Sequence, residues 1–138
     1  MIDPLEKRLG YLLRRASAAN MAELGAALAP LDLRPAEASI LLAIDANPGC
    51  TQSDVGRLLG IQRANMAPLI SALARRNLIS KARIDGRTQS LALTPEGAEM
   101  AERADRAMAA SDREILARLG DALCGKFAES LKILRSSN

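Results

Sequence analysis

Residues 51–93 decide the fold and read TQSDVGRLLGIQRANMAPLISALARRNLISKARIDGRTQSLAL. The stretch opens with a helix start, because the Thr51 hydroxyl can cap a helix and Asp54, three residues on, resembles the acid of a capping box. Three apolar residues are expected to form the buried side of this short helix: Val55, Leu58 and Leu59. Gly60 then ends the helix in a tight turn, where a small residue is favoured.

A second helix is predicted from about Gln62 to Arg76, since its apolar residues recur three and four positions apart. The residues that we expect to face inward are Met66, Leu69, Ile70 and Leu73. Asn77 stands where a helix end favours a left-handed residue, a conformation that Asn tolerates. The two helices and the short turn between them have the order of a helix-turn-helix.

The period of the sequence changes after this helix. Two short runs, 78–83 and 89–93, have the composition of strands, and Asp85-Gly86 lies between them. An Asp-Gly dipeptide between such runs is typical of a β-hairpin turn. The sequence therefore predicts a wing of two strands directly after the helix-turn-helix.

The flanking sequence is helical on the N-terminal side. We expect a first helix to begin after Asp3-Pro4, with Asp3 as its N-cap, and to end at Pro30. A second helix should follow Pro35 and stop at the turn-forming sequence 46–49.

The C-terminal side is also predicted to be helical. Thr94-Pro95-Glu96 has the order of an N-cap, a first-turn proline and a first-turn acid, so a long helix should run from there to about Arg118. Gly120 should stop it, and Asp121 should cap a last helix. The fold class is mostly α with a small β-wing, in a single domain over residues 1–138 whose residues 35–94 form the winged helix-turn-helix.

Composition narrows the class of protein. The 138 residues include only two aromatic side chains, Tyr11 and Phe127, so the core must be built from Leu, Ile, Ala and Met. No apolar run approaches the roughly 20 residues of a membrane span, and we expect no signal peptide. Cys50 and Cys124 are too few for a disulfide framework, which favours a cytoplasmic protein. With no His and no Gly-rich phosphate loop, the sequence predicts neither an enzyme nor a metal site or cofactor.

Basic residues gather in the middle of the chain. Between Arg57 and Arg87 there are seven Lys and Arg residues and a single acid, Asp85, which gives a net charge of +6. The rest of the chain carries −3, since the whole carries +3. Such a basic block between neutral or acidic flanks is the electrostatic footprint of a surface that binds a polyanion. A solvated Arg-rich surface is the alternative that charge alone leaves open.

Specific residues in this block have the chemistry of a duplex DNA reader. The second helix of a helix-turn-helix enters the major groove with its N-terminal residues facing the bases, here Gln62, Arg63 and Asn65. Arg pairs with guanine, and Gln or Asn pairs with adenine. The preceding helix starts with residues whose hydroxyls and backbone N–H groups suit a phosphate: Thr51, Gln52 and Ser53.

The wing provides the second predicted contact. A narrow minor groove attracts inserted Arg side chains, and Arg87 is the candidate for this insertion. Asp85 could hold an Arg in place or simply serve the turn, and we expect it to do both. The predicted DNA-contacting set is completed by Arg75, Arg83, Asp85, Arg87 and Thr88.

Two other functions compete with sequence-specific DNA binding. A winged helix can also serve protein contacts or bind nucleic acid without specificity. The scarcity of aromatic side chains argues against single-stranded DNA or RNA, where bases stack on rings. A role in protein contacts alone would not need Arg63 and Arg87 on one face.

The sequence resembles the MarR family of bacterial regulators. Four segments carry the resemblance: residues 51–61, residues 73–79, Asp85-Gly86-Arg87 in the wing, and Leu93-Thr94-Pro95-Glu96-Gly97. The wing motif followed at this spacing by the Leu-Thr motif is fairly specific to that family.

The resemblance implies a homodimer that binds palindromic double-stranded DNA. In this family the terminal helices intertwine, which here implies dimerisation segments at 1–30 and 96–138. The residues implied are Leu5, Leu9, Leu12, Leu116, Leu119, Leu123, Phe127 and Leu131. The resemblance also implies a repressor that releases DNA when a small effector binds, commonly a phenolic or other aromatic acid or its thioester.

Three features depart from the family pattern. Pro68 lies inside the predicted recognition helix, where it removes a backbone donor and should bend or loosen the helix. Asn77 replaces the usual Gly after that helix. No Cys lies near the first helix, where peroxide-sensing members have one; Cys124 is expected in core or dimer packing, and Cys50 is expected to be inert, with an exposed redox thiol as the alternative.

Overall fold

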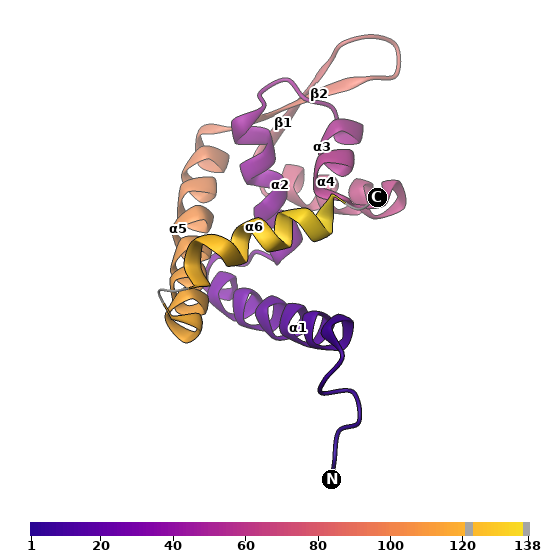
Figure 1. Ribbon diagram of the computed structural model, residues 1–138. Coiled ribbons are helices and arrows are strands. Elements are labelled where there is room, and N and C mark those ends of the chain that lie inside the picture. The colour runs from indigo at the N-terminus through magenta and orange to yellow at the C-terminus, as the bar shows by residue number, and fades with distance from the viewer. Residues whose placement is uncertain (121–122, 137–138) are drawn as a thin grey trace.

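The computed structural model describes residues 1–120 and 123–136, and its architecture is mostly helical with one small hairpin (Figure 1). In chain order the elements are α1 (Leu9–Leu28), the 3-10 turn η1 (Ala29–Leu31), α2 (Pro35–Ala46), α3 (Gln52–Leu59), α4 (Arg63–Arg75), β1 (Ile79–Arg83), β2 (Gln89–Leu93), α5 (Pro95–Leu119) and α6 (Cys124–Arg135). This order confirms the predicted fold class, a winged helix-turn-helix with helices on both sides of it.

Helix α2 lies at the centre of the core. Ile40, Leu41 and Ile44 have no exposed surface, and helices α1, α3, α4 and α5 all pack against α2. The rest of the core is aliphatic apart from Met66 on α4. Burial of each such side chain stabilises the fold by about 1.5–3 kcal/mol. The core therefore joins the helix-turn-helix to the two long helices.

The predicted helix boundaries are confirmed at several points. Thr51 and Thr94 are N-caps whose side chains accept hydrogen bonds from Asp54 and Gly97 backbone N–H groups. Gly60 has φ +67°, as its position after α3 requires. Asn77 has φ +57°, the left-handed conformation predicted at the end of the recognition helix. Helix α4 runs unbroken through Pro68.

Two expectations about helices were wrong. The first helix begins at Leu9 with Arg8 as its N-cap, and not after Pro4. The Asp3 carboxylate is instead occupied in a preceding turn, where it accepts the Leu5 N–H at 2.9 Å and the Tyr11 hydroxyl at 2.7 Å. Leu58 is 65% exposed, because α3 is only two turns long and Val55 alone of its apolar residues is fully buried.

The hairpin is anchored to the loop before α3. Strands β1 and β2 are antiparallel, with Ile79 opposite Leu93 and Arg83 opposite Gln89. The loop extends this pairing, because the Leu91 N–H donates to the Cys50 carbonyl at 2.8 Å and the Gly49 N–H donates to the Leu91 carbonyl at 2.9 Å. The base of the wing is therefore fixed relative to the start of α3.

A close backbone contact fixes the hairpin against α5. The Thr94 hydroxyl donates to the Asn77 carbonyl at 2.6 Å and accepts the Gly97 N–H at 2.9 Å. A Cβ on Gly97 would lie 1.8 Å from the Leu78 carbonyl oxygen. Only glycine therefore allows α5 to start this close to the end of α4 and the beginning of β1.

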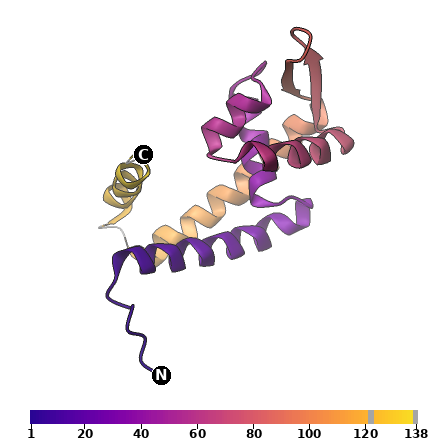
Figure 2. The ribbon, with the colours of Figure 1, turned by 90° about the vertical axis from the view of Figure 1, so that its right-hand side faces the viewer.

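Of the terminal helices, α1 and α5 pack against the winged helix-turn-helix, whereas α6 lies apart from it. Helix α1 packs on α5, and Figure 2 shows α6 separated from α2, α3 and α4. Large apolar side chains on these terminal segments are exposed, among them Leu5, Leu9, Leu12, Leu123, Phe127 and Leu131. Leu116 and Leu119 on α5 are half-buried. The predicted cap Asp121 and the side chain of Cys124 lie outside what the structure describes.

We expect Gly97→Ala to lower the free energy of unfolding by about 3 kcal/mol or more, because the new methyl group meets backbone rather than a side chain that could move. Gly25→Ala on α1 is the matched control, because a Cβ added at this position would have no atom within 4 Å. Alanine is also favoured over glycine in a helix by about 1 kcal/mol. Chemical denaturation at one fixed protein concentration measures the free energy of unfolding of both variants and of the wild type. Equal stability of the two variants would contradict the close contact.

Candidate nucleic-acid interface

A cationic cavity lies between the start of α3, the start of α4 and the hairpin. Its volume is about 350 Å³. The residues lining it are Thr51, Gln52, Ser53, Arg63, Lys81, Arg87, Thr88, Gln89 and Leu91. Six of these, from three separate elements, belong to the set that the sequence predicted to contact DNA. The fold thus brings Arg63 and Arg87 to one place.

The charge of this cavity has one sign. Arg63, Lys81 and Arg87 line it, and its lining includes no Asp or Glu. The N-terminus of α3 adds the partial positive charge of a helix start and the backbone N–H groups of Gln52 and Ser53. The arrangement can hold an anion with several hydrogen-bond acceptors, such as a phosphodiester.

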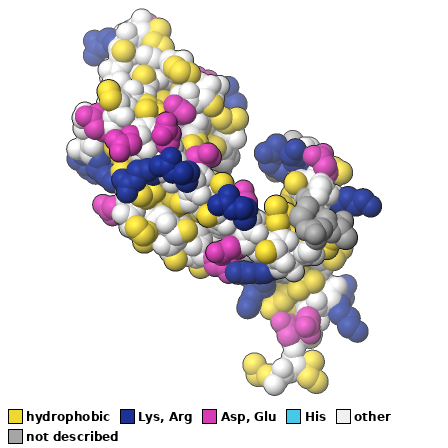
Figure 3. All heavy atoms as spheres, turned by 90° about the vertical axis from the view of Figure 1, so that its left-hand side faces the viewer, with side chains coloured by type: hydrophobic (Ala, Val, Ile, Leu, Met, Phe, Trp, Pro, Cys, Tyr) yellow, Lys and Arg dark blue, Asp and Glu magenta, His cyan; other side chains and the backbone are white. Residues whose placement is uncertain are grey.

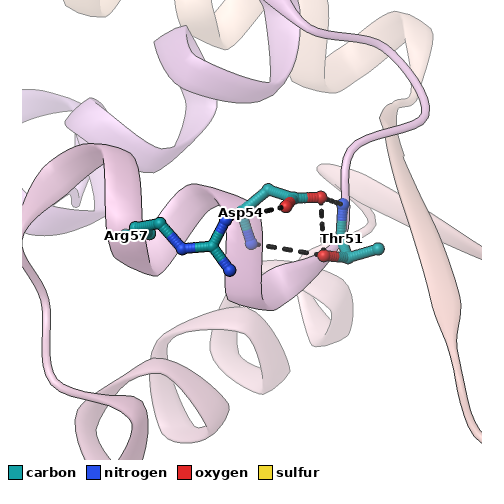
Figure 4. A network of polar contacts seen from close by, with 3 residues as sticks. All are labelled: Thr51, Asp54 and Arg57. Carbon is teal, nitrogen blue, oxygen red and sulfur yellow. Dashed lines mark hydrogen bonds and ion pairs between the residues drawn. The ribbon is translucent and has the colours of Figure 1, made fainter.

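A capping network holds the start of α3 in place (Figure 4). The Asp54 carboxylate accepts the Thr51 N–H at 2.9 Å and the Thr51 hydroxyl at 2.7 Å, while the Asp54 N–H donates to the Thr51 hydroxyl oxygen at 3.2 Å. These bonds to Thr51 hold the pKa of Asp54 below its usual range, with a smaller contribution from Arg57, whose guanidinium lies 3.8 Å away. The carboxylate therefore serves the cap that positions Thr51.

Asp85 serves the turn of the wing. Its carboxylate accepts the backbone N–H groups of Arg87 at 3.2 Å and Thr88 at 3.0 Å. These bonds lower the pKa of Asp85. Of the two roles expected for this acid, the hydrogen bonds support the turn, and the backbone bond to Arg87 fixes where that side chain leaves the hairpin.

The remaining predicted contact residues lie near the cavity or far from it. Gln62 and Asn65 are exposed beside Arg63 in the first turn of α4. Arg83 lies two residues beyond Lys81 on β1 and opposite Gln89, so it shares their face of the hairpin. Arg75 is different, because it lies at the other end of α4, about 18 Å along the helix axis from Arg63.

Sequence reasoning missed two polar residues of the cavity. Lys81 lies in the basic block without a predicted contact, and Gln89 has no predicted role beyond its strand. The two-residue period of the strands was the available signal, since Lys81 and Arg83 alternate onto one face and Gln89 pairs with Arg83. The hairpin register was needed to use that signal.

Other parts of the surface do not have the uniform positive charge of this cavity. Figure 3, which shows the α5 side, has acidic and basic side chains intermingled. On the terminal helices a mainly apolar groove of about 520 Å³ is lined by residues of α1, α5 and α6, including Leu119, Phe127 and Leu131. The Arg118 guanidinium donates to the Glu23 carboxylate at 2.9 Å in the same groove and joins α5 to α1.

Cys50 does not have the surroundings of a redox-sensing thiol. It is half-buried, and burial raises the pKa of its thiol, as does the nearby negative charge of Asp54. A reactive cysteine needs the opposite shift. The inert interpretation of Cys50 is therefore favoured.

Two further features bear on the class of protein. Within residues 1–120 and 123–136, His, Cys, Asp and Glu side chains form no group of three or more that could hold a metal ion. None of the helices in the described ranges combines the length and the apolar character of a membrane span.

Comparisons with known proteins agree on one family. A family model described as MarR family matches residues 31–88 of this chain. The HTH-type transcriptional repressor Rv2887 of Mycobacterium tuberculosis (strain H37Rv) is 31% identical over 113 residues, which cover 80% of this chain and 81% of that protein.

Solved structures of similar proteins include ligand complexes. The transcriptional repressor CouR, bound to p-coumaroyl-CoA, has a TM-score of 0.89 and 29% identity, and the match covers 100% of this chain and 99% of that one. Rv2887 in complex with salicylic acid has a TM-score of 0.76 and 29% identity, over 94% of this chain and 97% of that one.

We expect Asp54→Asn to lower the melting temperature at pH 7 by a few degrees. The lowered pKa means that the ionised carboxylate stabilises the folded protein above about pH 4, and that this contribution is lost as pH falls through the folded-state pKa. The difference from wild type should therefore narrow below about pH 4. Thermal unfolding at pH 7 and pH 3.5 measures this, with the exposed Asp112→Asn on α5 as the control; a difference that stays constant with pH would contradict the capping role.

Proposed function

This chain belongs to the MarR family of transcriptional regulators, and from that premise we propose that it represses transcription as a homodimer on duplex DNA. We further propose that a small aromatic acid or its thioester releases it from the DNA. Members of this family are in general regulators and not enzymes, which agrees with a sequence that contains no His.

The observation that carries the proposal is the convergence of three elements on one cationic cavity. Arg63 comes from α4, Arg87 from the wing and Ser53 from the start of α3. A phosphate held in this cavity would fix the register of α4 in the major groove, because phosphate contacts position a protein on DNA. Arg63, Gln62 and Asn65 would then read base edges, and Arg87 would lie toward the minor groove.

The homodimer is supported by the apolar surface of the terminal segments. Leu9 on α1 is 83% exposed, and Leu12 and Leu131 are exposed as well. Leu13 of α1 and Leu131 of α6 also line one mainly apolar groove, and exposed apolar surface of this kind marks an interaction site. A second copy that covers it would place two α4 helices at one fixed separation, which suits half-sites about one helical turn apart.

A ligand response is supported by the complexes of similar repressors. CouR is described with p-coumaroyl-CoA, and Rv2887 with salicylic acid. A ligand lowers DNA affinity only if it binds the DNA-free shape of the dimer more tightly. The acid that acts on this chain would therefore stabilise a different placement of the two α4 helices.

We expect Arg63→Ala and Arg87→Ala to weaken DNA binding in different ways. Loss of Arg63 should cost about 1–3 kcal/mol on the preferred sequence and relax the preference at one base pair. Loss of Arg87 should weaken binding to every duplex and reduce the slope of log K against log salt by about 1. Fluorescence anisotropy with DNA from upstream of this chain's own gene measures both.

The control is Arg103→Ala, an exposed residue on α5 that should leave both quantities unchanged. If Arg63→Ala and Arg87→Ala both bind DNA with the affinity of the wild type, this face of the protein does not bind DNA. Equal affinity of the wild type for all duplexes would favour non-specific binding, the competing function.

We expect the wild-type chain to sediment as a dimer at micromolar concentration and Leu12→Glu to shift it toward monomer, because the charge would be buried at the interface without a partner. Leu58→Glu is the matched control, since Leu58 is an exposed leucine on α3, away from the terminal helices. Sedimentation velocity compares the three proteins. A monomeric wild type would contradict the proposed homodimer.

A further inference from the structure

An exposed isoleucine stands at the tip of the wing. Ile84 directly follows β1 and is 58% exposed. The other large apolar side chains of the hairpin lie at its base, where they are buried or packed against the core: Ile79, Leu91 and Leu93. Ile84 lies about 16 Å along the strand from Ile79, and the loop that contains it projects beyond α3 (Figure 1). Ile84 is therefore out of reach of the core.

The conformation of the turn does not depend on the Ile84 side chain. The Ile84 N–H donates to the Thr88 carbonyl at 2.9 Å. The Asp85 carboxylate accepts the backbone N–H groups of Arg87 and Thr88. A β-branched residue favours the extended backbone beside this turn, but Thr would meet that preference with a polar surface. The apolar character of Ile84 is therefore not explained by the turn.

The surroundings of Ile84 are those of a tip that contacts DNA. Arg83 precedes it, Arg87 lies across the turn, and both are exposed. A protein partner matches this tip poorly, because one isoleucine between two guanidinium groups is far smaller than the roughly 800 Å² that each partner of a stable complex buries. The minor groove of DNA is about 6 Å wide and has anionic walls, so it can accept one apolar side chain flanked by arginines.

The floor of the minor groove differs between base pairs in one chemical group. An A·T pair shows only acceptors, adenine N3 and thymine O2, whereas a G·C pair adds the guanine 2-amino donor. The side chain of Ile84 contains no hydrogen-bond acceptor. Its contact with a G·C pair would leave that donor unsatisfied, at a cost of about tenfold in affinity. An isoleucine on the groove floor therefore favours A·T.

We infer that Ile84 is a specificity-determining residue of the wing, which packs on the floor of the minor groove and excludes guanine from the base pair beneath it. The inference rests on the proposed DNA-binding function. Arg87 is attracted by the negative potential of a narrow groove, and Ile84 senses the 2-amino group. The A·T requirement falls about half a helical turn, or about 5 bp, from the bases that Arg63 reads.

The test separates the 2-amino group from every other feature of a G·C pair. An inosine·cytosine pair has the major groove of G·C and the minor groove of A·T, because inosine lacks the 2-amino group. The full-length protein is titrated by fluorescence anisotropy against duplexes from upstream of its own gene, with each A·T pair replaced in turn by G·C or by inosine·cytosine.

For the wild type we expect one position in each half-site where G·C weakens binding about tenfold and inosine·cytosine restores it. A pair that is read in the major groove behaves differently, since both replacements weaken binding there.

A matched pair of variants assigns this discrimination to Ile84. Val and Thr have the same shape, but the Thr hydroxyl can accept a hydrogen bond from the guanine amino group. Ile84→Val should keep the preference for inosine·cytosine over G·C, and Ile84→Thr should reduce it to about twofold or less. Ile2→Thr, at an exposed isoleucine of the N-terminal segment, is the control and should match the wild type.

Two results would overturn the inference and leave the proposed regulator intact. One is sequence-specific binding with no position at which inosine·cytosine restores what G·C loses. The other is the same discrimination in Ile84→Val as in Ile84→Thr, which would show that the apolar character of residue 84 does not matter. Equal affinity of the wild type for all duplexes would instead contradict the proposed function, and the inference with it.

Discussion

The placement of the wing depends on the contact between Gly97 and the Leu78 carbonyl. A side chain at residue 97 would overlap that oxygen, so the start of α5 and the residue before β1 meet at backbone distance. Thr94 closes the same junction, since its hydroxyl bonds to the Asn77 carbonyl and caps α5. These contacts fix the orientation of the hairpin relative to α5. Arg87 on the wing and Arg63 on α4 line the same cavity because backbone geometry far from both side chains places the hairpin beside α4.

Much of the fold could be predicted from local chemistry. The capping box at Thr51, the left-handed Asn77 and the Asp85-Gly86 turn each act over a few residues, so the sequence contains all that decides them. Asp3 shows where this reasoning fails. Its carboxylate could cap a helix, but the Tyr11 hydroxyl eight residues away competes for it. The prediction that Leu58 is buried was wrong for a similar reason, because the burial of a side chain depends on which neighbours its short helix contacts.

The candidate site was less predictable, since it joins residues from separate elements. Arg63 and Arg87 could be assigned because each occupies a position with a known geometric role in a winged helix. Lys81 and Gln89 needed the strand register, and the bonds of Arg76 needed the packing of α4 on the turn after α1. No spacing in the sequence indicates that Arg76 reaches the carbonyls of Leu31 and Asp32, more than forty positions earlier.

Helix α4 has a different partner at each end, and this gives it a mechanical role. Arg63 at its start lines the cationic cavity, and Arg76 after its last turn holds the segment that follows α1. The helix is about 20 Å long, so a small rotation at one end displaces the other. Pro68 lies between the ends and donates no hydrogen bond to the Ala64 carbonyl, but the helix continues through it, and Met66 and Ile70 on either side are buried in the core. The bonds of Arg76 therefore hold the C-terminal end of α4 to the segment after α1, while the start of the helix places Arg63 in the cationic cavity.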